Sequence, residues 1–158
     1  RSDDICTAIR IAQEYDVDLV LVHCTDGIAI ADYLAKFHYP VIIGPGMTPR
    51  SKQETWNKTY ETAGVLSRAG LKVCITADHD VTPLYYLPVY AALAVRHGLD
   101  ELEGLKAVTL NPAQVLGIDD RKGQLKAGLD ADIVVWKQHP FAYQTQVEQV
   151  FLAGKPMC

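Results

Sequence analysis

The chain has 158 residues, 49% of them apolar, and a formal net charge of −4 at pH 7. This length predicts one globular unit with a sizeable core, and the evenly mixed charges predict no nucleic acid or membrane surface as partner. A small molecule is therefore the expected partner. No apolar run approaches the roughly 20 residues that span a bilayer and no signal peptide opens the chain, so a cytoplasmic location is expected.

The four cysteines are far apart and form no C-x-x-C pair, which predicts reduced and mostly buried thiols. The first predicted element is an amphipathic helix over residues 2–15, with Ser2 as N-cap and apolar residues at helical spacing. Residues 17–24 are short, apolar and β-branched, which predicts a strand buried on both faces, as in a parallel sheet. His23 lies near the end of this strand.

Helices and strands alternate through the next fifty residues. Pro40 forces an extended restart, and Ser51 with Glu54 predicts a capping box for a long helix that ends at Gly70. Helix-bearing connections of this length place neighbouring strands parallel, with right-handed crossovers. The predicted elements are a helix over 27–37, a strand over 41–43, a helix over 52–69 and a strand over 71–77.

The pattern changes after Asp80. Three helices are expected first, because Gly98, Asp100 and Gly117 supply stop and cap signals. Strand signals then predict a small β subdomain. The helices are expected over 85–97, 100–110 and 111–117, and the strands over 123–125, 131–136 and 147–152, with a turn over 153–156.

Two chemically active side chains lie at the carboxyl ends of predicted parallel strands, where ligands gather in α/β sheets. His23 ends the strand 17–24, and Asp78 follows the strand 71–77. Imidazole and carboxylate are common ligands of a catalytic divalent ion, and a carboxylate also serves as a general base. The spacing of the pair is not diagnostic. A core histidine satisfied by the backbone, with an aspartate that caps the next turn, explains the same residues.

The other histidines are weaker candidates. His79 follows Asp78 directly, and strand alternation points the two side chains in opposite directions. His38 and His97 fall in the last turns of predicted helices, where a cation complements the free carbonyls. His139 lies in a predicted loop and is expected to be solvated.

Two further features each allow two interpretations. The segment 44–46, Gly-Pro-Gly, is either a substrate loop or a simple strand exit. Tyr85 and Tyr86 either face a pocket or, as aromatic residues that enter an apolar helix more often do, belong to the core.

Two groups of short motifs lie along the chain. The N-terminal group is RSDDI at 1–5, HCTD at 23–26, GP at 44–45 and TAD at 76–78. The C-terminal group is TLNPA at 109–113, the glycines at 117 and 123, KAG at 126–128, ADIVVW at 131–136 and GK at 154–155. Together these motifs resemble the amidohydrolase superfamily, specifically its imidazolonepropionase-like and prolidase-like branch, and the resemblance covers essentially the whole chain.

The resemblance implies an α/β fold, namely the C-terminal part of a (β/α)8 TIM barrel with part of a small β-sandwich. Residues 1–117 would supply barrel strands six to eight with their helices, and residues 118–158 the sandwich segment. His23 would close strand six, residues 41–43 would be strand seven, and Asp78 would close strand eight.

The implied activity is metal-dependent hydrolysis of a C–N bond in a cyclic amide or small dipeptide by a metal-activated water. His23 and Asp78 would be ligands of a divalent metal, expected to be zinc, and Asp78 would also shuttle the proton. The family's remaining ligands would precede Arg1. Because a catalytic zinc site needs about three protein ligands, the chain is expected to be part of a longer enzyme and not an efficient hydrolase alone.

Two expectations accompany this interpretation. A three-stranded parallel sheet would leave two open edges with unpaired backbone groups, so the chain is expected to form a homo-oligomer through these edges or to be marginally stable. The alternative function is a non-catalytic α/β module for binding or assembly.

Overall fold

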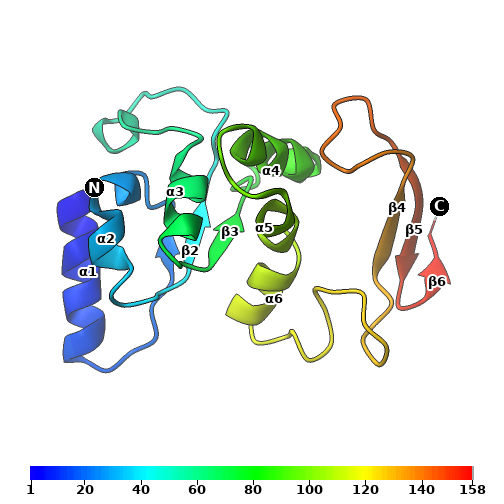
Figure 1. The fold of residues 1–158 in the computed structure, drawn as a ribbon, viewed down its shortest axis with the longest axis horizontal. Helices are drawn as coiled ribbons and strands as arrows, with labels where there is room; N and C mark the ends of the chain where they lie inside the picture. Colours follow the sequence, from blue (N-terminus) through cyan, green and yellow to red (C-terminus); the bar gives the residue numbers. More distant parts are fainter. Residues whose placement is uncertain (158) are drawn as a thin grey trace.

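The structure is a computed structural model that describes residues 1–157, and it contains two separate three-stranded sheets (Figure 1). The first is parallel, in the order β1 (Leu21–Val22), β2 (Val41–Ile43), β3 (Val73–Ile75). The second is antiparallel, in the order β4 (Ile133–Trp136), β5 (Val147–Leu152), β6 (Lys155–Pro156). The predicted α/β fold with parallel strands, followed by a second group of strands, is therefore observed.

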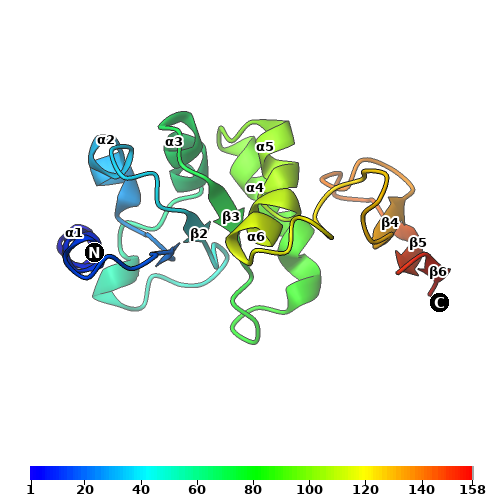
Figure 2. The same ribbon diagram turned by 90° about the horizontal axis from the view of Figure 1, so that it is seen from below.

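The helices lie between and around the sheets. Figure 2 shows α2 and α3 on the same side of the parallel sheet, and both views place the antiparallel sheet at the far end of the molecule from α1. None of the helices among residues 1–157 is long and apolar enough to cross a membrane. The α-helices are α1 (Ser2–Glu14), α2 (Ala31–Leu34), α3 (Thr62–Arg68), α4 (Leu87–Arg96), α5 (Glu101–Lys106) and α6 (Leu110–Val115), and the 3₁₀ helices are η1 (Gly27–Ile30), η2 (Gln53–Thr55) and η3 (Leu84–Tyr86).

The main core lies where α1, α3 and α4 meet the parallel sheet. Ile9, Val41 and Leu66 are fully buried there, and α1 contributes the apolar face that its sequence spacing predicts. The cysteines follow the predicted pattern in part: Cys24 and Cys74 are buried and Cys6 is half-buried, all three as free thiols, whereas Cys158 lies outside the described residues. Burial raises the pKa of the Cys24 and Cys74 thiols to about 11.

The first predicted strand is shorter and more exposed than expected. β1 has two residues in place of the predicted 17–24, although it pairs parallel to β2 as predicted, with Leu21 opposite Val41. Val22 is 55% exposed, so the prediction of burial on both faces is wrong for this strand. β1 is also an edge strand, which has a neighbour on one side only among residues 1–157.

The long helix predicted over 52–69 is also wrong in its first half. Within this range only α3 is an α-helix, and the expected first turn is the 3₁₀ helix η2. The Thr55 hydroxyl, and not Ser51 with Glu54, pairs with the backbone of Lys52. Lys58 donates from its side chain to the carbonyl and the hydroxyl of Thr48, and these contacts stabilise a loop in place of a helix. Tertiary hydrogen bonds have therefore overridden the local helix signal.

The remaining elements agree with the prediction except at three places. The helix expected over 27–37 divides into η1 and α2 and ends at Leu34. Residues 123–125 form no strand, and Leu125 is 81% exposed, because no neighbouring strand covers it. β6 arises where only a turn was expected: the left-handed residues Ala153 (φ 50°) and Gly154 (φ 76°) reverse the chain tightly enough for the following residues to pair with β5.

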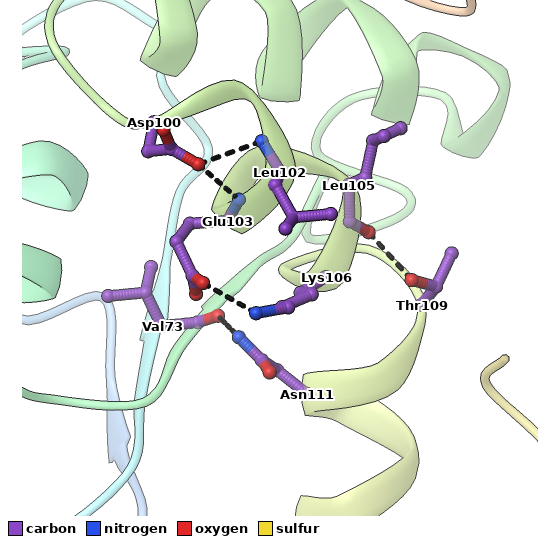
Figure 3. A network of polar contacts seen from close by, with 8 residues as sticks. All are labelled: Val73, Asp100, Leu102, Glu103, Leu105, Lys106, Thr109 and Asn111. Carbon is purple, nitrogen blue, oxygen red and sulfur yellow. Dashed lines mark hydrogen bonds and ion pairs between the residues drawn. The ribbon is translucent and has the colours of Figure 1, made fainter.

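One edge of the parallel sheet is closed by the chain itself (Figure 3). The side-chain amide of Asn111 donates to the carbonyl of Val73 (2.7 Å). The Ile75 N–H donates to the carbonyl of Ala107 (2.9 Å). These are the β3 groups that point away from β2, because alternate residues of a strand face opposite neighbours. The expectation of two open edges is therefore wrong: the edge of β3 is paired, and that of β1 is the exposed one.

Two local groups of hydrogen bonds precede Asn111 in the chain. Asp100 caps α5 by accepting from the N–H groups of Leu102 (2.9 Å) and Glu103 (3.2 Å), as its sequence position predicts. The Thr109 hydroxyl then donates to the carbonyl of Leu105 (2.7 Å) at the turn into α6. The TLNPA motif at 109–113 thus has a structural role, which is to dock α6 onto β3.

Candidate active site

The two predicted site residues lie close together at the carboxyl end of the parallel sheet. Nε2 of His23 and Oδ2 of Asp78 are 4.0 Å apart, although 55 positions separate the residues in the sequence. Both residues have left-handed backbone conformations, with φ of 66° and 51°. Such conformations are uncommon for residues with a Cβ and often occur at functional sites, where the surrounding structure holds them.

A backbone carbonyl orients the imidazole of His23. Nδ1 lies 2.5 Å from the carbonyl oxygen of Gly44. A carbonyl only accepts hydrogen bonds, so Nδ1 carries the proton and Nε2 of the neutral ring keeps a free lone pair. That lone pair belongs to the nitrogen nearest Asp78. An arrangement of this kind is typical of histidines that bind metals.

The turn that follows β3 uses the backbone of Asp78 and not its carboxylate. Its N–H donates to the hydroxyl of Thr76 (3.0 Å), and its backbone carbonyl accepts from the N–H of Val81 (2.7 Å). The side chains of His23 and Asp78 are 48% and 43% exposed. The alternative was a core histidine satisfied by the backbone beside an aspartate that caps the next turn. His23 does have a backbone partner, but neither side chain is buried, and the turn after Asp78 is closed by the Val81 N–H and the Asp78 carbonyl.

The Gly-Pro-Gly loop after β2 is part of the site. A Cβ on Gly44 would lie 2.2 Å from the carbonyl oxygen of Thr76, and the φ of Gly44 is +130°, so only glycine fits here. This close approach brings the exits of β2 and β3 together and places the Gly44 carbonyl against His23. Of the two interpretations of the loop, the structure supports a role at the site, since Gly44 and Pro45 line the same hollow as His23 and Asp78.

The hollow has a volume of about 910 Å³ and is open to solvent. Lys58 and Thr48 also line it. The sequence indicates neither residue, because the helix predicted over 52–69 would place Lys58 on a helix and away from Thr48. The spacing of Thr48, Arg50 and Lys58 contains no signal of its own, and only the observed loop brings these residues together.

The other candidates lie apart from this pair. His79 is exposed, His97 caps the C-terminus of α4 as predicted, and His38 follows α2 beyond its last turn. His139 is 3.7 Å from a carboxylate oxygen of Glu101, so it has a partner where only solvent was expected. Tyr85 and Tyr86 are 74% and 41% exposed, so the prediction that they belong to the core is wrong.

His23 and Asp78 are the two metal-ligand types at this end of the sheet. Across residues 1–157, no group of three or more His, Cys, Asp or Glu side chains has a geometry suited to a metal ion. The pair offers one nitrogen and one carboxylate, which are 4.0 Å apart. Zinc bonds to these ligand types are about 2.0–2.2 Å long, so two ligands of a tetrahedral zinc lie roughly 3.4 Å apart. The two side chains would have to approach each other by about half an ångström to share such an ion.

Comparison with known proteins identifies the family. A family described as the amidohydrolase family matches residues 10–158. The chain belongs to the amidohydrolase family. This membership agrees with the resemblance that the motifs indicate, and it does not favour the alternative of a non-catalytic binding or assembly module.

Individual amidohydrolases and their neighbours give the same result. The crystal structure of an amidohydrolase from Thermotoga maritima superposes on the whole chain with a TM-score of 0.95 and 43% identity, and the chain covers 41% of that protein. Amidohydrolase tasK of Hapsidospora irregularis is 34% identical over 65% of this chain and 10% of its own length. The imidazolonepropionase of Thermoplasma volcanium is 33% identical over 62% of this chain and 26% of its own length.

A zinc-containing structure is also similar. An adenosine deaminase from Xanthomonas campestris, solved with bound zinc, has a TM-score of 0.65 and 28% identity over 87% of this chain and 36% of its own. In all these cases the chain spans less than half the length of the relative.

Proposed function

We propose that the chain forms part of the active site of a longer metal-dependent hydrolase that cleaves the C–N bond of a cyclic amide or small dipeptide. The observation that carries this proposal is the free Nε2 of His23, held by the Gly44 carbonyl at 4.0 Å from the Asp78 carboxylate. Family membership and the carboxyl-end position of both residues support it.

The proposal includes an assignment of the fold. Residues 1–117 would be the C-terminal part of a (β/α)8 barrel, with β1, β2 and β3 as strands six, seven and eight. Residues 118–158 would be a segment of a small β-sandwich. The parallel order of the three strands and the superposition on the Thermotoga maritima amidohydrolase support this assignment.

His23 and Asp78 are the residues that would hold a divalent metal, for which zinc is the first candidate because imidazole and carboxylate are among its usual ligands. When bound, such an ion polarises a carbonyl and lowers the pKa of a water molecule. The role of His23 is to present Nε2 in the correct tautomer, which the Gly44 carbonyl enforces. Further ligands would come from other parts of the longer protein.

The role proposed for Asp78 is proton transfer. Its carboxylate is half-exposed in the hollow and free of turn hydrogen bonds, so it can accept a proton from the attacking water and deliver it to the leaving nitrogen. The Thr76 hydroxyl holds the backbone of Asp78 and so positions the carboxylate without neutralising it. A small, cytoplasmic amide is the substrate expected for this arrangement.

The test uses the longest protein that the gene encodes, stripped of metal and reloaded with zinc or manganese, against a panel of cyclic amides and dipeptides. Asp78→Asn is expected to lower kcat by roughly 10²–10⁴-fold, the usual contribution of a general acid or base. Asp120→Asn, which changes an exposed carboxylate after α6, is the matched control and should leave kcat unchanged.

Metal binding gives a second, independent measurement. His23→Ala is expected to lower the metal content of the purified protein, and His79→Ala, at an exposed histidine beside Asp78, should not. Full activity of Asp78→Asn, or equal metal content in the two histidine variants, would refute the assigned roles.

A further inference from the structure

One buried side chain contacts both loops that carry the candidate site. Tyr90 lies in α4 and is 4% exposed. Together with His23 and Gly44 it lines a small cavity of about 50 Å³ at the carboxyl end of the parallel sheet. Its ring and its hydroxyl contact different loops, so each part of the side chain is considered in turn.

The ring of Tyr90 packs against the loop that follows β2. A Cβ on Gly46 would lie 3.5 Å from Cδ1 of Tyr90 and 2.6 Å from Cε1 of Tyr60, so the backbone of this loop is in direct contact with both rings. Gly44, whose carbonyl orients the imidazole of His23, is two residues earlier. The ring therefore supports the loop that orients His23.

The hydroxyl of Tyr90 holds the turn that follows β3. It donates to the hydroxyl of Thr82 (2.8 Å), directly after the turn that begins with Asp78. Inside that turn the N–H of Val81 donates to the carbonyl of Asp78 (2.7 Å). Within residues 1–157, the Tyr90 hydroxyl makes the only hydrogen bond that joins residues 79–82 to another element of the fold.

The turn after Asp78 has few other supports. Residues 79–81 are exposed, so side-chain packing does not fix their conformation. Asp78 itself has a left-handed φ of 51°, which persists only where the surrounding structure holds it. The Thr76 hydroxyl provides such a contact on one side of Asp78, and the hydrogen bond between Tyr90 and Thr82 provides one on the other.

We propose that Tyr90 is a positioning residue for Asp78: its hydroxyl, through Thr82, holds the turn that keeps the Asp78 carboxylate near Nε2 of His23. This inference rests on the proposed hydrolase function for the role of Asp78 in proton transfer. A general acid or base acts in the transition state, so loss of the Tyr90 hydroxyl should slow the reaction and leave substrate binding unchanged.

The first experiment measures the turn in the 158-residue chain and needs no substrate. Tyr90→Phe keeps the ring against Gly46 and removes the hydroxyl alone. The exchange rate of the Val81 N–H, followed by NMR, should rise by roughly threefold to tenfold, which corresponds to the net contribution of one hydrogen bond. The N–H of Thr76, which pairs with the carbonyl of Ile43, should exchange as in the original chain.

Two threonine variants complete this experiment. Thr82→Val removes the other half of the same hydrogen bond, so it should raise Val81 exchange as Tyr90→Phe does, and the double variant should show no further rise. Thr109→Val is the matched control, because the Thr109 hydroxyl also makes one hydrogen bond, to the Leu105 carbonyl (2.7 Å), but at the turn between α5 and α6. Unchanged Val81 exchange in Tyr90→Phe, or an equal rise in Thr109→Val, would overturn the proposal.

The second experiment uses the longest protein that the gene encodes, loaded with metal. Tyr90→Phe and Thr82→Val should each lower kcat for the hydrolysed amide by roughly threefold to tenfold with KM unchanged. Thr82→Ser keeps the hydroxyl and should retain kcat, and Thr109→Val should alter neither value. A rise in KM with kcat unchanged, or equal losses in the two Thr82 variants, contradicts a positioning role.

The two experiments separate this inference from the proposed function. If no amide is hydrolysed while Val81 exchange responds to Tyr90→Phe as expected, the hydrolase function fails and the hold of Tyr90 on the turn stands. If Asp78→Asn loses activity while Tyr90→Phe keeps its full kcat, the hydrolase function stands and this inference fails alone.

Discussion

Replacing Asn111 should expose how much the chain depends on closing the edge of β3. Asn111 is 7% exposed and its amide donates to the carbonyl of Val73, a residue that is itself 3% exposed. Asn111→Ala leaves that carbonyl buried without a partner, which destabilises a protein by about 1–3 kcal/mol, and removes the packing of the amide group as well. We expect the free energy of unfolding to fall by about 2–3 kcal/mol.

The assay is urea unfolding followed by circular dichroism, with thermal unfolding beside it. For a chain of this size a loss of 2–3 kcal/mol corresponds to a decrease in Tm of roughly 4–12 °C. Hydrogen exchange adds a local measurement: the Ile75 N–H, which pairs with the Ala107 carbonyl on the same edge, should exchange faster in the variant.

Asn57→Ala is the matched control. The Asn57 amide also makes one hydrogen bond, to Oδ1 of Asp26 (3.0 Å), but the residue is exposed. Its loss should therefore change stability by less than about 1 kcal/mol. The reasoning is refuted if the two variants unfold at the same urea concentration, or if the exchange of Ile75 is unaffected by Asn111→Ala.

Three further predictions follow from single positions. Gly64→Ala should destabilise the chain by about 1–3 kcal/mol in urea, because the added Cβ would lie 2.6 Å from backbone atoms of Gly98; an unchanged midpoint contradicts this packing. Partial burial, with a smaller contribution from Arg50, lowers the pKa of Lys58 in the folded state, so between that pKa and the ordinary value of 10.5 the unfolded state binds more protons. The free energy of unfolding should therefore rise with pH in that window, and Lys58→Met should remove the rise. The same dependence of the unfolding free energy on pH in the original chain and in Lys58→Met would contradict this. Val22 lies on the open strand β1 and is 55% exposed, so the chain should self-associate through this edge and Val22→Lys should weaken the association in sedimentation experiments; a monomer at every concentration contradicts it.

The proximity of His23 and Asp78 could be predicted because it depends on sequence patterns within each strand, and the folded chain keeps those strands. An apolar β-branched run that ends in a polar residue is read directly from the sequence, and parallel strands with helical connections bring their carboxyl ends together whatever their lengths. His23 and Asp78 follow this logic, and their 4.0 Å separation confirms their proximity. The tautomer of His23 was not predictable, because the carbonyl that decides it belongs to Gly44 on the neighbouring strand exit.

The sequence by itself determined the alternation of helices and strands up to residue 77, the parallel direction of β1 to β3, the change to a second group of strands after residue 130, and the residue types at the strand ends. These properties depend on side-chain periodicity and capping within a few positions. Only the tertiary structure decided which edge of the sheet is closed, how the chain runs between Thr48 and Lys58, and that Arg50 joins Lys58 there. Those features depend on hydrogen bonds between residues that no local pattern connects, such as Asn111 with Val73, and such bonds form only once the elements have packed.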